Sequence, residues 1–253
     1  MAYPSEFTSR ANFELAFTRI VRGQNQDYKR FYRHLLSSYQ LALSDNLHDL
    51  IDDIKRGTYK PSPGTLIFEP KKSGILRPLR LLTLRDLVVY QAVANVLATS
   101  FQKVQKKYAF DKCFGAIFAG KSSPFFYTKW KTSYKKYNWS IKRAFKAGND
   151  FVADFDLVSF YELIDHNLLR ESLRRQVQNQ ELLNLLFDCL EMWSTNKKGA
   201  HIQHGIPQGP EPSAFLAECF LFYFDALKFK RAHYFRYVDD IKLMAKDEVA
   251  VRR

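Results

Sequence analysis

The fold of this chain is decided by one stretch, Tyr234-Phe235-Arg236-Tyr237-Val238-Asp239-Asp240-Ile241-Lys242-Leu243-Met244. Apolar and β-branched residues on both sides favour strands, and the two polar residues Asp239 and Asp240 between these runs predict a tight hairpin turn. Neighbouring carboxylates at such a tip repel each other unless a cation lies there, and Mg²⁺ is the natural partner for oxygen ligands. The alternative is a solvated turn, because Asp is a common turn residue.

The composition is that of a globular protein. With 253 residues, of which 46% are hydrophobic, the chain can bury a sizeable core as one large domain or two small ones. It contains no run of about 18 uncharged apolar residues and no basic-then-apolar signal at its N-terminus, so we expect a cytoplasmic protein without a membrane span. Cys113, Cys189 and Cys219 lie among aromatic or aliphatic residues, which predicts buried thiols instead of disulfides or a zinc site.

The charge of the chain predicts an extended anionic partner. The formal net charge is +13, and nucleic acid is the first candidate, ahead of a membrane surface. Between Phe101 and Asn149 the sequence is dense in Lys and aromatic residues, and Asp111 is the only acid. This pattern is typical of a surface that follows a nucleic acid backbone and stacks its bases, although a merely solvated basic helix is the alternative.

The first third of the chain reads as helices followed by a basic hairpin. Apolar residues recur every three or four positions from Asn12 to about Leu43 with a break near Gly23, and a further helix closes at Gly57. Residues 65–82 then place Lys and Arg on both sides of a Ser-Gly turn between two apolar strands. Such a hairpin can close over a polyphosphate, but it can equally be a solvated surface. A strongly apolar, capped helix follows over residues 84–97.

Two further clusters carry polar chemistry. Residues 151–155 alternate as a strand does, and the carboxylates of Asp154 and Asp156 would point to the same face, so the pattern alone does not choose between them. A long helix follows from Asp165 to about Leu190. Gly and Pro residues at 205–212 then form a loop whose backbone can approach a ligand closely, and a helix starts near Ser213.

These clusters, in this order, resemble the palm of reverse transcriptases over nearly the whole chain, and most closely the group II intron-derived bacterial branch. The matching residues are Arg77-Pro78-Leu79 and Asp86 in the fingers, residues 156–166 in the first catalytic motif, residues 205–209 in the second and Tyr237-Val238-Asp239-Asp240 in the third. Gln208-Gly209-Pro210, Ser213, residues 216–218 and Asp225 also resemble the abortive-infection and unknown-group defence-associated enzymes.

The resemblance implies the roles of individual residues. Asp156 and Asp239 would be the main ligands of two Mg²⁺ ions, with Asp240 beside them; the distance to Asp165-His166 selects Asp156 over Asp154. The remaining implied contacts are those of the nucleotide: Lys71 or Lys72 and Arg77 for the triphosphate, Tyr161 as the aromatic gate that crowds a ribose 2′-hydroxyl, and Gln208 for the incoming nucleotide or the template. Tyr161 could instead be a core tyrosine.

The implied fold is an α+β right-hand polymerase with an antiparallel palm sheet packed on helices. We expect an N-terminal helical region at 1–60, fingers with the basic-aromatic insertion at 61–150 and the first part of the palm at 151–253. The sequence stops at Arg253, where family members continue into a primer grip and a thumb. We therefore expect a chain truncated before the thumb, which is a fragment, or has lost that part, or receives it from a further domain, another chain or a homo-oligomer.

The implied function is that of an RNA-directed DNA polymerase that uses an RNA template and dNTPs to make DNA, in bacterial anti-phage defence. One alternative is a non-catalytic palm-fold module that binds nucleic acid or supports assembly. The other is an RNA-dependent RNA polymerase, which Tyr161 and Val238, where Gly would be usual, disfavour.

Overall fold

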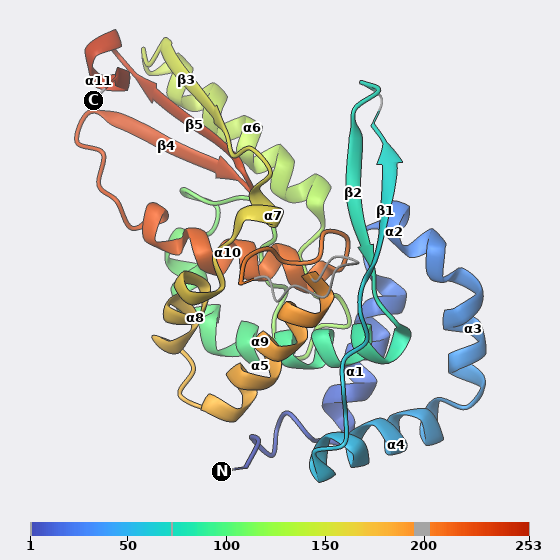
Figure 1. Cartoon of the computed structure of the whole chain (residues 1–253). Coiled ribbons are helices and arrows are strands. Elements are labelled where there is room, and N and C mark those ends of the chain that lie inside the picture. The colour runs from blue at the N-terminus through green and yellow to red at the C-terminus, as the bar shows by residue number, and fades with distance from the viewer. Residues whose placement is uncertain (1, 72, 195–202, 253) are drawn as a thin grey trace.

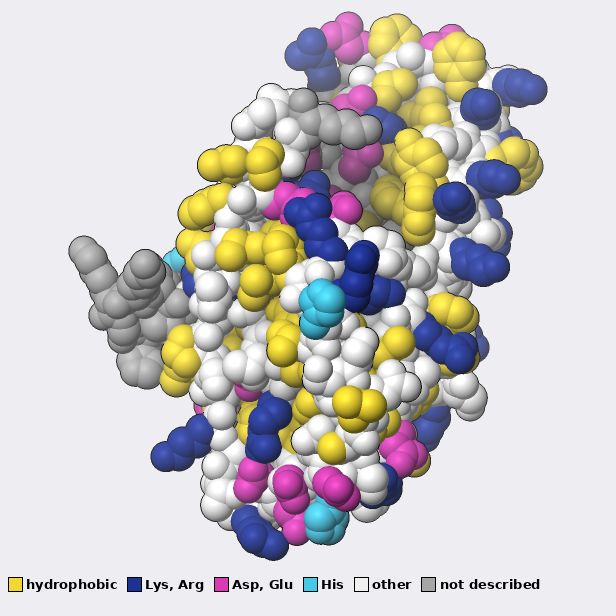
Figure 2. Space-filling model, turned by 90° about the vertical axis from the view of Figure 1, so that its right-hand side faces the viewer, with side chains coloured by type: hydrophobic (Ala, Val, Ile, Leu, Met, Phe, Trp, Pro, Cys, Tyr) yellow, Lys and Arg dark blue, Asp and Glu magenta, His cyan; other side chains and the backbone are white. Residues whose placement is uncertain are grey.

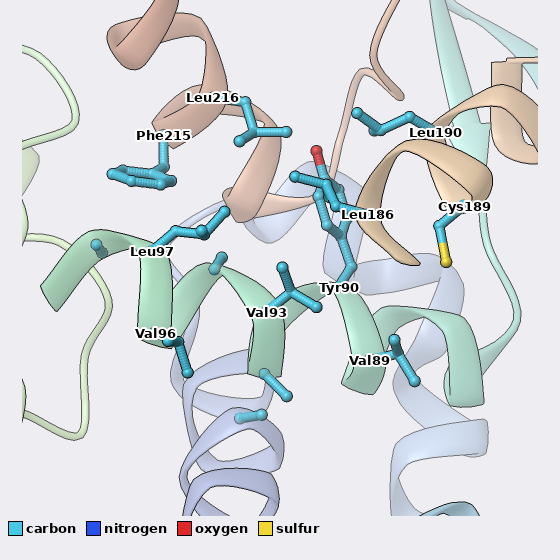
Figure 3. Packing of buried hydrophobic residues seen from close by; sticks show 14 of the residues in the cluster. Val89, Tyr90, Val93, Val96, Leu97, Leu186, Cys189, Leu190, Phe215 and Leu216 are labelled. Carbon is cyan, nitrogen blue, oxygen red and sulfur yellow. The ribbon is translucent and has the colours of Figure 1, made fainter. Parts of the chain in front are cut away.

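Helices form the main body of the protein, as the computed structural model, which describes residues 2–71, 73–194 and 203–252, shows in Figure 1. At its centre lies α5 (Leu84–Tyr108), whose residues from Asp86 to Ala98 are all buried. The strongly apolar sequence predicted this burial, and the helix extends beyond the predicted end at residue 97. Figure 3 shows Val89, Tyr90, Val93, Val96 and Leu97 of α5 among the buried side chains of α9 (Gln180–Ser194) and α10 (Glu211–Asp225).

The N-terminal helices pack against this centre. They are α1 (Arg10–Arg22), α2 (Gln26–Lys29), the 3-10 helix η1 (Arg30–Tyr32), α3 (Arg33–Leu41) and α4 (Leu43–Arg56). The predicted break near Gly23 is confirmed, because α1 ends at Arg22. Gly57 closes α4 in the left-handed conformation with φ 70°, which glycine adopts without strain.

A two-stranded hairpin stands away from the helical body. Strands β1 (Thr65–Pro70) and β2 (Leu76–Leu81) pair antiparallel from Thr65 opposite Leu81 to Pro70 opposite Leu76. Gly74 supplies the positive φ, 83°, that the connecting turn requires. The predicted basic hairpin is confirmed, and Figure 1 shows it facing the second sheet across the top of the molecule.

The second sheet has the strand order β3-β5-β4 and is antiparallel throughout. Its strands are β3 (Phe151–Asp156), β4 (Ala232–Tyr237) and β5 (Asp240–Ala245). On one face, Tyr137 and Ala144 of α6 (Trp130–Lys146) form a small core with Phe235 and Met244. On the other face, Tyr234 donates a hydrogen bond to Asp225 of α10. A helix thus covers each face of β4, while the end of the sheet that carries the carboxylates points toward the first hairpin.

The long helix predicted from Asp165 to about Leu190 is wrong, because the chain forms two helices there. After the short α7 (Phe160–Leu163), α8 (His166–Arg174) ends where the amides of Gln176 and Val177 donate to the carbonyl of Leu173. The side chain of Asn179 then caps α9 by accepting from the amide of Leu182 at 2.8 Å. Polar capping competes with helix continuation, and the apolar periodicity alone did not show it.

The three cysteines are buried and free, as predicted. Across residues 2–71, 73–194 and 203–252, no helix is both long and apolar enough to cross a membrane. The last helix, α11 (Glu248–Arg252), is short and has no buried residue.

Candidate active site

The tip of the β4–β5 hairpin has a different register from the one the sequence suggested. Tyr237 pairs with Asp240, so the turn consists of Val238 and Asp239, and Asp240 is already the first residue of β5. We expected the two Asp residues to form the turn between them. Val238 instead takes the left-handed conformation, with φ 59°, which is unusual for a β-branched residue. Such a conformation persists only where surrounding contacts enforce it.

Two contacts enforce this turn. The guanidinium of Arg236 donates to the carbonyl of Val238 at 2.8 Å. Gly115 packs directly against the turn, since a Cβ added to it would lie 2.5 Å from Val238 Cγ2 and 2.6 Å from Val238 N. The loop before Gly115 is joined to β4 as well, because Phe114 N donates to Arg236 O and Arg236 N donates to Lys112 O. The conformation of the turn that carries Asp239 is therefore fixed in part by the segment around Gly115, which is more than a hundred residues away in sequence.

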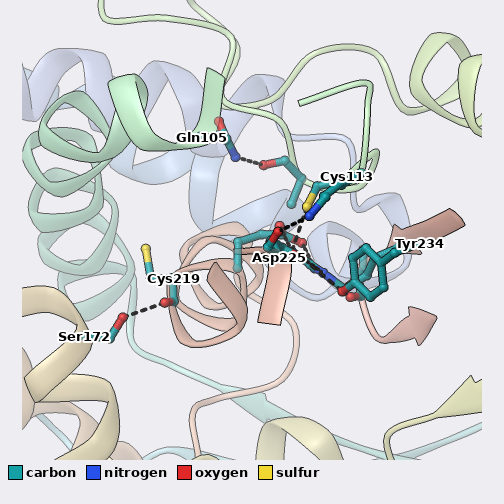
Figure 4. A network of polar contacts seen from close by, with 11 residues as sticks. Gln105, Cys113, Ser172, Cys219, Asp225 and Tyr234 are labelled. Atoms are coloured by element: carbon teal, nitrogen blue, oxygen red, sulfur yellow. Dashed lines mark hydrogen bonds and ion pairs between the residues drawn. The ribbon is translucent and has the colours of Figure 1, made fainter. Parts of the chain in front are cut away.

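Arg236 is fully buried and paired with two buried carboxylates. Its guanidinium donates to both oxygens of Glu218 at 2.9 Å, and to the Asp225 oxygens at 2.9 and 2.6 Å. It also contacts Cys113 Sγ at 3.3 Å, and Figure 4 shows Cys113, Asp225 and Tyr234 close together in one network of polar contacts. Burial raises the pKa of Glu218, and Arg236 opposes that rise. Bidentate pairs of this kind fix geometry, so α10 and the hairpin form one rigid unit.

Three carboxylates meet at the same end of the sheet. Asp156, the last residue of β3, lies opposite Asp240 in the antiparallel register, and Asp239 lies beside them in the turn. The pKa of Asp239 is raised by burial and then by the negative charges of Asp156 and Asp240, while Lys71 lowers it. By contrast, Asp154 lies opposite Lys242, whose ammonium donates to its carboxylate. The structure thus distinguishes the surroundings of the two Asp residues of β3, which the sequence pattern could not.

The three carboxylates are ligands of the chemical type that a hard divalent cation prefers. Asp156, Asp239 and Asp240 supply oxygen ligands only, and burial together with the negative charges of Asp156 and Asp240 raises the pKa of Asp239. Within the described residues, however, no group of three or more His, Cys, Asp or Glu side chains is arranged to hold a metal ion. The protein therefore brings the three carboxylates to one place without assembling a finished coordination cluster.

A cavity of about 270 Å³ opens beside the hairpin tip. Its walls come from seven parts of the chain, and three residues proposed from sequence, Arg77 of β2, Tyr161 of α7 and Gln208, line it. The other lining residues that matter here are Tyr237 and Val238 of the hairpin and Trp130 and Ser133 of α6. In Figure 2 a hollow with acidic side chains is seen in the upper part of the face on view.

Tyr161 and its neighbour Phe160 point to different surroundings. Phe160 is buried against Phe220, whereas Tyr161 is half-buried and lines the cavity. Burial raises the pKa of Tyr161, the negative charge of Asp239 raises it further, and Arg77 opposes the rise. The hydroxyl of Tyr161 is therefore neutral and can act as a hydrogen-bond donor at the cavity wall.

The Pro-Gln-Gly loop is held in place by contacts of its backbone and by the close packing of Gly209. Arg80 N of β2 donates to Gln208 O at 3.0 Å, which joins the loop to the fingers hairpin. Gly209 has φ 130°, and a Cβ there would lie 2.2 Å from the ring of Tyr28, so only glycine fits. Ser213 is fully buried and donates to Pro207 O, which makes it a structural residue of this loop.

Asp165, His166 and Asp86 also have structural positions. Asp165 caps α8 by accepting from the amides of Asn167 and Leu168, and the buried imidazole of His166 hydrogen-bonds to Gly205 O at 2.6 Å. His166 thus holds the loop that carries Gln208, whereas Asp165 fixes the start of α8. Asp86, matched to the fingers from sequence, is buried and accepts from Tyr59 and Thr83 at 2.6 Å, which stabilises the start of α5.

Two of the three cations expected at the triphosphate lie on or directly beside the strands of the β1–β2 hairpin. Arg77 is on β2 and lines the cavity, and Lys71 at the end of β1 is close enough to lower the pKa of Asp239. Lys72, the third predicted cation, lies outside the described residues.

Sequence reasoning missed Gln24, which joins three walls of the cavity. Its side chain donates to the carbonyls of Tyr127 and Thr128, and accepts from the amide of Trp130 at 3.0 Å. Its backbone amide donates to the half-buried carboxylate of Glu211. No local pattern marks Gln24, because all the partners of its side chain are about a hundred or more residues away. Only the helix break at Gly23 pointed to this part of the chain.

Comparison with known sequences gives distant relatives. No protein-family model matches the chain. It is 26% identical over 233 residues to the group II intron-encoded protein LtrA of Lactococcus lactis subsp. cremoris, which covers 84% of this chain and 35% of that protein. It is 25% identical over 194 residues to protein YkfC of Escherichia coli K12, covering 74% and 46%. A putative COX1/OXI3 intron 1 protein of Saccharomyces cerevisiae is 25% identical over 170 residues, covering 64% and 18%. The chain thus spans less than half the length of these relatives.

Comparison with solved structures establishes the fold. A partial Cas6-RT-Cas1–Cas2 complex matches 96% of this chain and 38% of its own, with a TM-score of 0.53 and 17% identity. The apo telomerase of Candida tropicalis, truncated from its C-terminal domain, matches 76% of this chain and 46% of its own, with a TM-score of 0.51 and 14% identity. The predicted α+β fingers-and-palm fold of reverse transcriptases is confirmed.

Proposed function

We propose that this chain, with its reverse transcriptase fold and its distant similarity to group II intron-encoded proteins, is the fingers and palm of an RNA-directed DNA polymerase. The observation that supports this most strongly is the cavity that brings Arg77, Tyr161 and Gln208 together beside the hairpin tip that carries Asp239. A nucleotide triphosphate needs cations, a surface for its sugar and base, and a site for divalent ions within a few ångströms of each other. The cavity and the adjoining carboxylates supply all three.

In this proposal each residue has a separate task. Arg77 and Lys71 bind the triphosphate, and removing either cation would weaken binding by about 1.5–3 kcal/mol, the usual strength of a hydrogen bond to a charged group. Tyr161 crowds the ribose 2′-hydroxyl and so selects dNTPs, which also speaks against an RNA-dependent RNA polymerase. Gln208 contacts the incoming nucleotide or the template.

Asp156, Asp239 and Asp240 would hold two Mg²⁺ ions. When bound, the two ions activate the attacking 3′-hydroxyl and stabilise the leaving pyrophosphate. The protein itself contributes the rigid placement of the carboxylates, because the buried Arg236 and Gly115 fix the turn that carries Asp239. An RNA template, a DNA product, and a thumb from a further domain or chain belong to the same proposal.

A biological setting in anti-phage defence, in the cytoplasm of a bacterium, is part of this proposal. It is supported by the resemblance of residues 208–225 to the abortive-infection and unknown-group enzymes.

A second candidate is a non-catalytic palm-fold module that binds nucleic acid. It is favoured by one observation, that the described carboxylates are not arranged as a finished metal-binding group. The two candidates differ in whether nucleotides are incorporated.

The test is incorporation of labelled dNTPs with and without an RNA template in Mg²⁺, by the intact protein and by an Asp239→Ala/Asp240→Ala variant. We expect signal from the intact protein only. Equal signal from both proteins would falsify the enzymatic proposal, and no signal from a folded intact protein that binds RNA would favour the non-catalytic module.

A further inference from the structure

The exposed side of α6 has a composition that the cavity does not explain. The helix carries six Lys and Arg residues and no acid. Lys131, Lys135, Lys142 and Lys146 are separated by four, seven and four positions, intervals that keep side chains on one face of a helix. At 1.5 Å per residue this row is about 22 Å long. It is a row of positive charge on the helix that packs against the β3-β5-β4 sheet.

These charges are not compensated by the protein. All four lysines are exposed, and no ion pair joins them to a carboxylate anywhere in the residues that the structure describes. One of them makes a cation–π contact: Lys131 Nζ lies 5.8 Å from the ring centroid of Trp130. A row of like charges destabilises a compact protein unless a polyanion binds to it.

Aromatic side chains stand on both sides of this row. Tyr134 and Phe145, with 46% and 59% of their surface exposed, lie along one side, and Trp139, 61% exposed, lies along the other. Single exposed apolar residues are normal on a protein surface, but three exposed rings beside one row of lysines on the same helix form a group that can contact a ligand. Figure 2 shows Lys and Arg side chains alternating with hydrophobic ones along one edge of the molecule.

The row leads to the cavity. The ring of Tyr134 contacts that of Tyr237, at 5.4 Å between centroids, next to the turn that carries Asp239. At the start of the helix, Trp130 and Ser133 are themselves part of the cavity wall. A ligand that lies along α6 therefore meets the cavity at the start of the helix, where Trp130 and Ser133 form part of the wall.

We propose that this surface, made of Lys131, Lys135, Lys142, Lys146, Tyr134, Trp139 and Phe145 and called here the α6 face, binds a single-stranded polynucleotide and guides it to the cavity. The inference rests on the proposed polymerase function and adds the path of its nucleic acid. Cations contact the phosphates while exposed rings stack on unpaired bases, a combination that single strands satisfy and duplexes do not.

Other polyanions fit the α6 face less well. An acidic polypeptide would pair with the lysines but has no planar groups for three exposed rings. An anionic membrane would need an apolar side of the helix to insert, and the apolar side of α6, with Tyr137 and Ala144, is packed against the sheet.

The test is binding of a fluorescent oligouridylate of about 12 nucleotides to the whole chain, without Mg²⁺ or dNTPs, at several salt concentrations. Replacing the four lysines by Gln should reduce the slope of log affinity against log salt by up to about 2.8, which is about 0.7 for each phosphate contact. The Trp139→Ala/Phe145→Ala variant should bind about 5- to 150-fold more weakly for each stacked base, with the same salt slope.

A charge-matched control is the replacement of Lys55, Arg56, Arg174 and Arg175 by Gln, at exposed positions on α4 and α8 away from α6 (Figure 1). The control should keep the slope and affinity of the intact protein. The proposal is overturned if the α6 variants bind as the intact protein does, if the control loses as much, if a duplex binds as tightly, or if polyglutamate displaces the oligonucleotide at equal charge.

The outcome is separable from that of the proposed function. The Asp239→Ala/Asp240→Ala variant should keep α6-dependent binding while it loses nucleotide incorporation. Normal binding by the α6 variants together with active incorporation would refute the α6 face alone. If the Asp239→Ala/Asp240→Ala variant incorporates nucleotides as the intact protein does, or if the intact protein incorporates none, the polymerase proposal is refuted. The binding result is unaffected by either outcome.

Discussion

Removal of Arg236 should be among the most damaging single changes in this protein. The Arg236→Met variant keeps most of the side-chain volume but leaves Glu218 and Asp225 buried without their cation. Breaking a buried pair in this way costs about 3–5 kcal/mol, a large part of the 5–15 kcal/mol by which a typical domain is stable. Loss of the hydrogen bond to Val238 O adds a net cost of about 1 kcal/mol.

The loss should depend on pH with a known sign. Without Arg236, the pKa of the buried Glu218 carboxyl rises further, and a group whose pKa is raised in the folded state destabilises that state as pH increases. The deficit of Arg236→Met should therefore be larger at pH 8 than at pH 5. Urea unfolding followed by circular dichroism at both values measures it.

A second variant separates charge from packing. The Arg236→Met/Glu218→Gln/Asp225→Asn variant no longer contains the two unpaired buried carboxylates, so its free energy of unfolding should return most of the way to that of the intact protein. A single variant that loses less than about 1 kcal/mol, or a triple variant no more stable than the single one, would contradict the role we assign to this cluster.

Three further changes test the site itself. Gly115→Ala should cost about 1–3 kcal/mol of stability and reduce incorporation, because the new Cβ lies 2.5 Å from Val238 Cγ2 and must displace the turn; unchanged Tm and activity would show that the loop yields freely. Tyr161→Ala should relax discrimination against ribonucleotides, measured as the ratio of dNTP to NTP incorporation, and an unchanged ratio would refute the gate. Asp239→Asn should raise the free energy of unfolding in metal-free buffer at pH 7, because burial and neighbouring carboxylates raise the pKa of Asp239. A raised folded-state pKa means that stability is lost as pH rises above the unfolded value of about 3.9, so the difference should vanish near pH 3. Mg²⁺ at ten times its dissociation constant should return about 1.4 kcal/mol to the intact protein alone, and equal stabilisation of both would contradict binding at Asp239.

The parts of the fold that local patterns encode were predictable. The strands around Asp239 and Asp240, the basic hairpin and the loop at residues 205–209 all have their signal within a few neighbouring residues. The Cys burial and the central helix follow from composition in the same way.

The remainder depends on distant contacts. The one-residue shift of the turn to Val238 and Asp239 is imposed by Gly115 and by the bond from Arg236, which no strand propensity contains. Arg236 itself reads as an ordinary polar residue of a strand, and its burial is visible only once α10 places two carboxylates against it.

The choice between Asp154 and Asp156 shows the same limit. Both alternate onto one face of β3, and only the pairing of β3 with β5 places one opposite Lys242 and the other opposite Asp240. Tertiary pairing thus supplies the electrostatic difference between two positions that are equivalent in the strand pattern.

The most direct test of the central claim compares these two residues. Asp156→Ala and Asp154→Ala remove the same group from the same face of the same strand, two positions apart. Incorporation of labelled dNTPs on an RNA template should be abolished by Asp156→Ala and largely kept by Asp154→Ala. Loss of incorporation only in Asp154→Ala, or equal activity in both variants, would contradict the assignment of Asp156 to the active site.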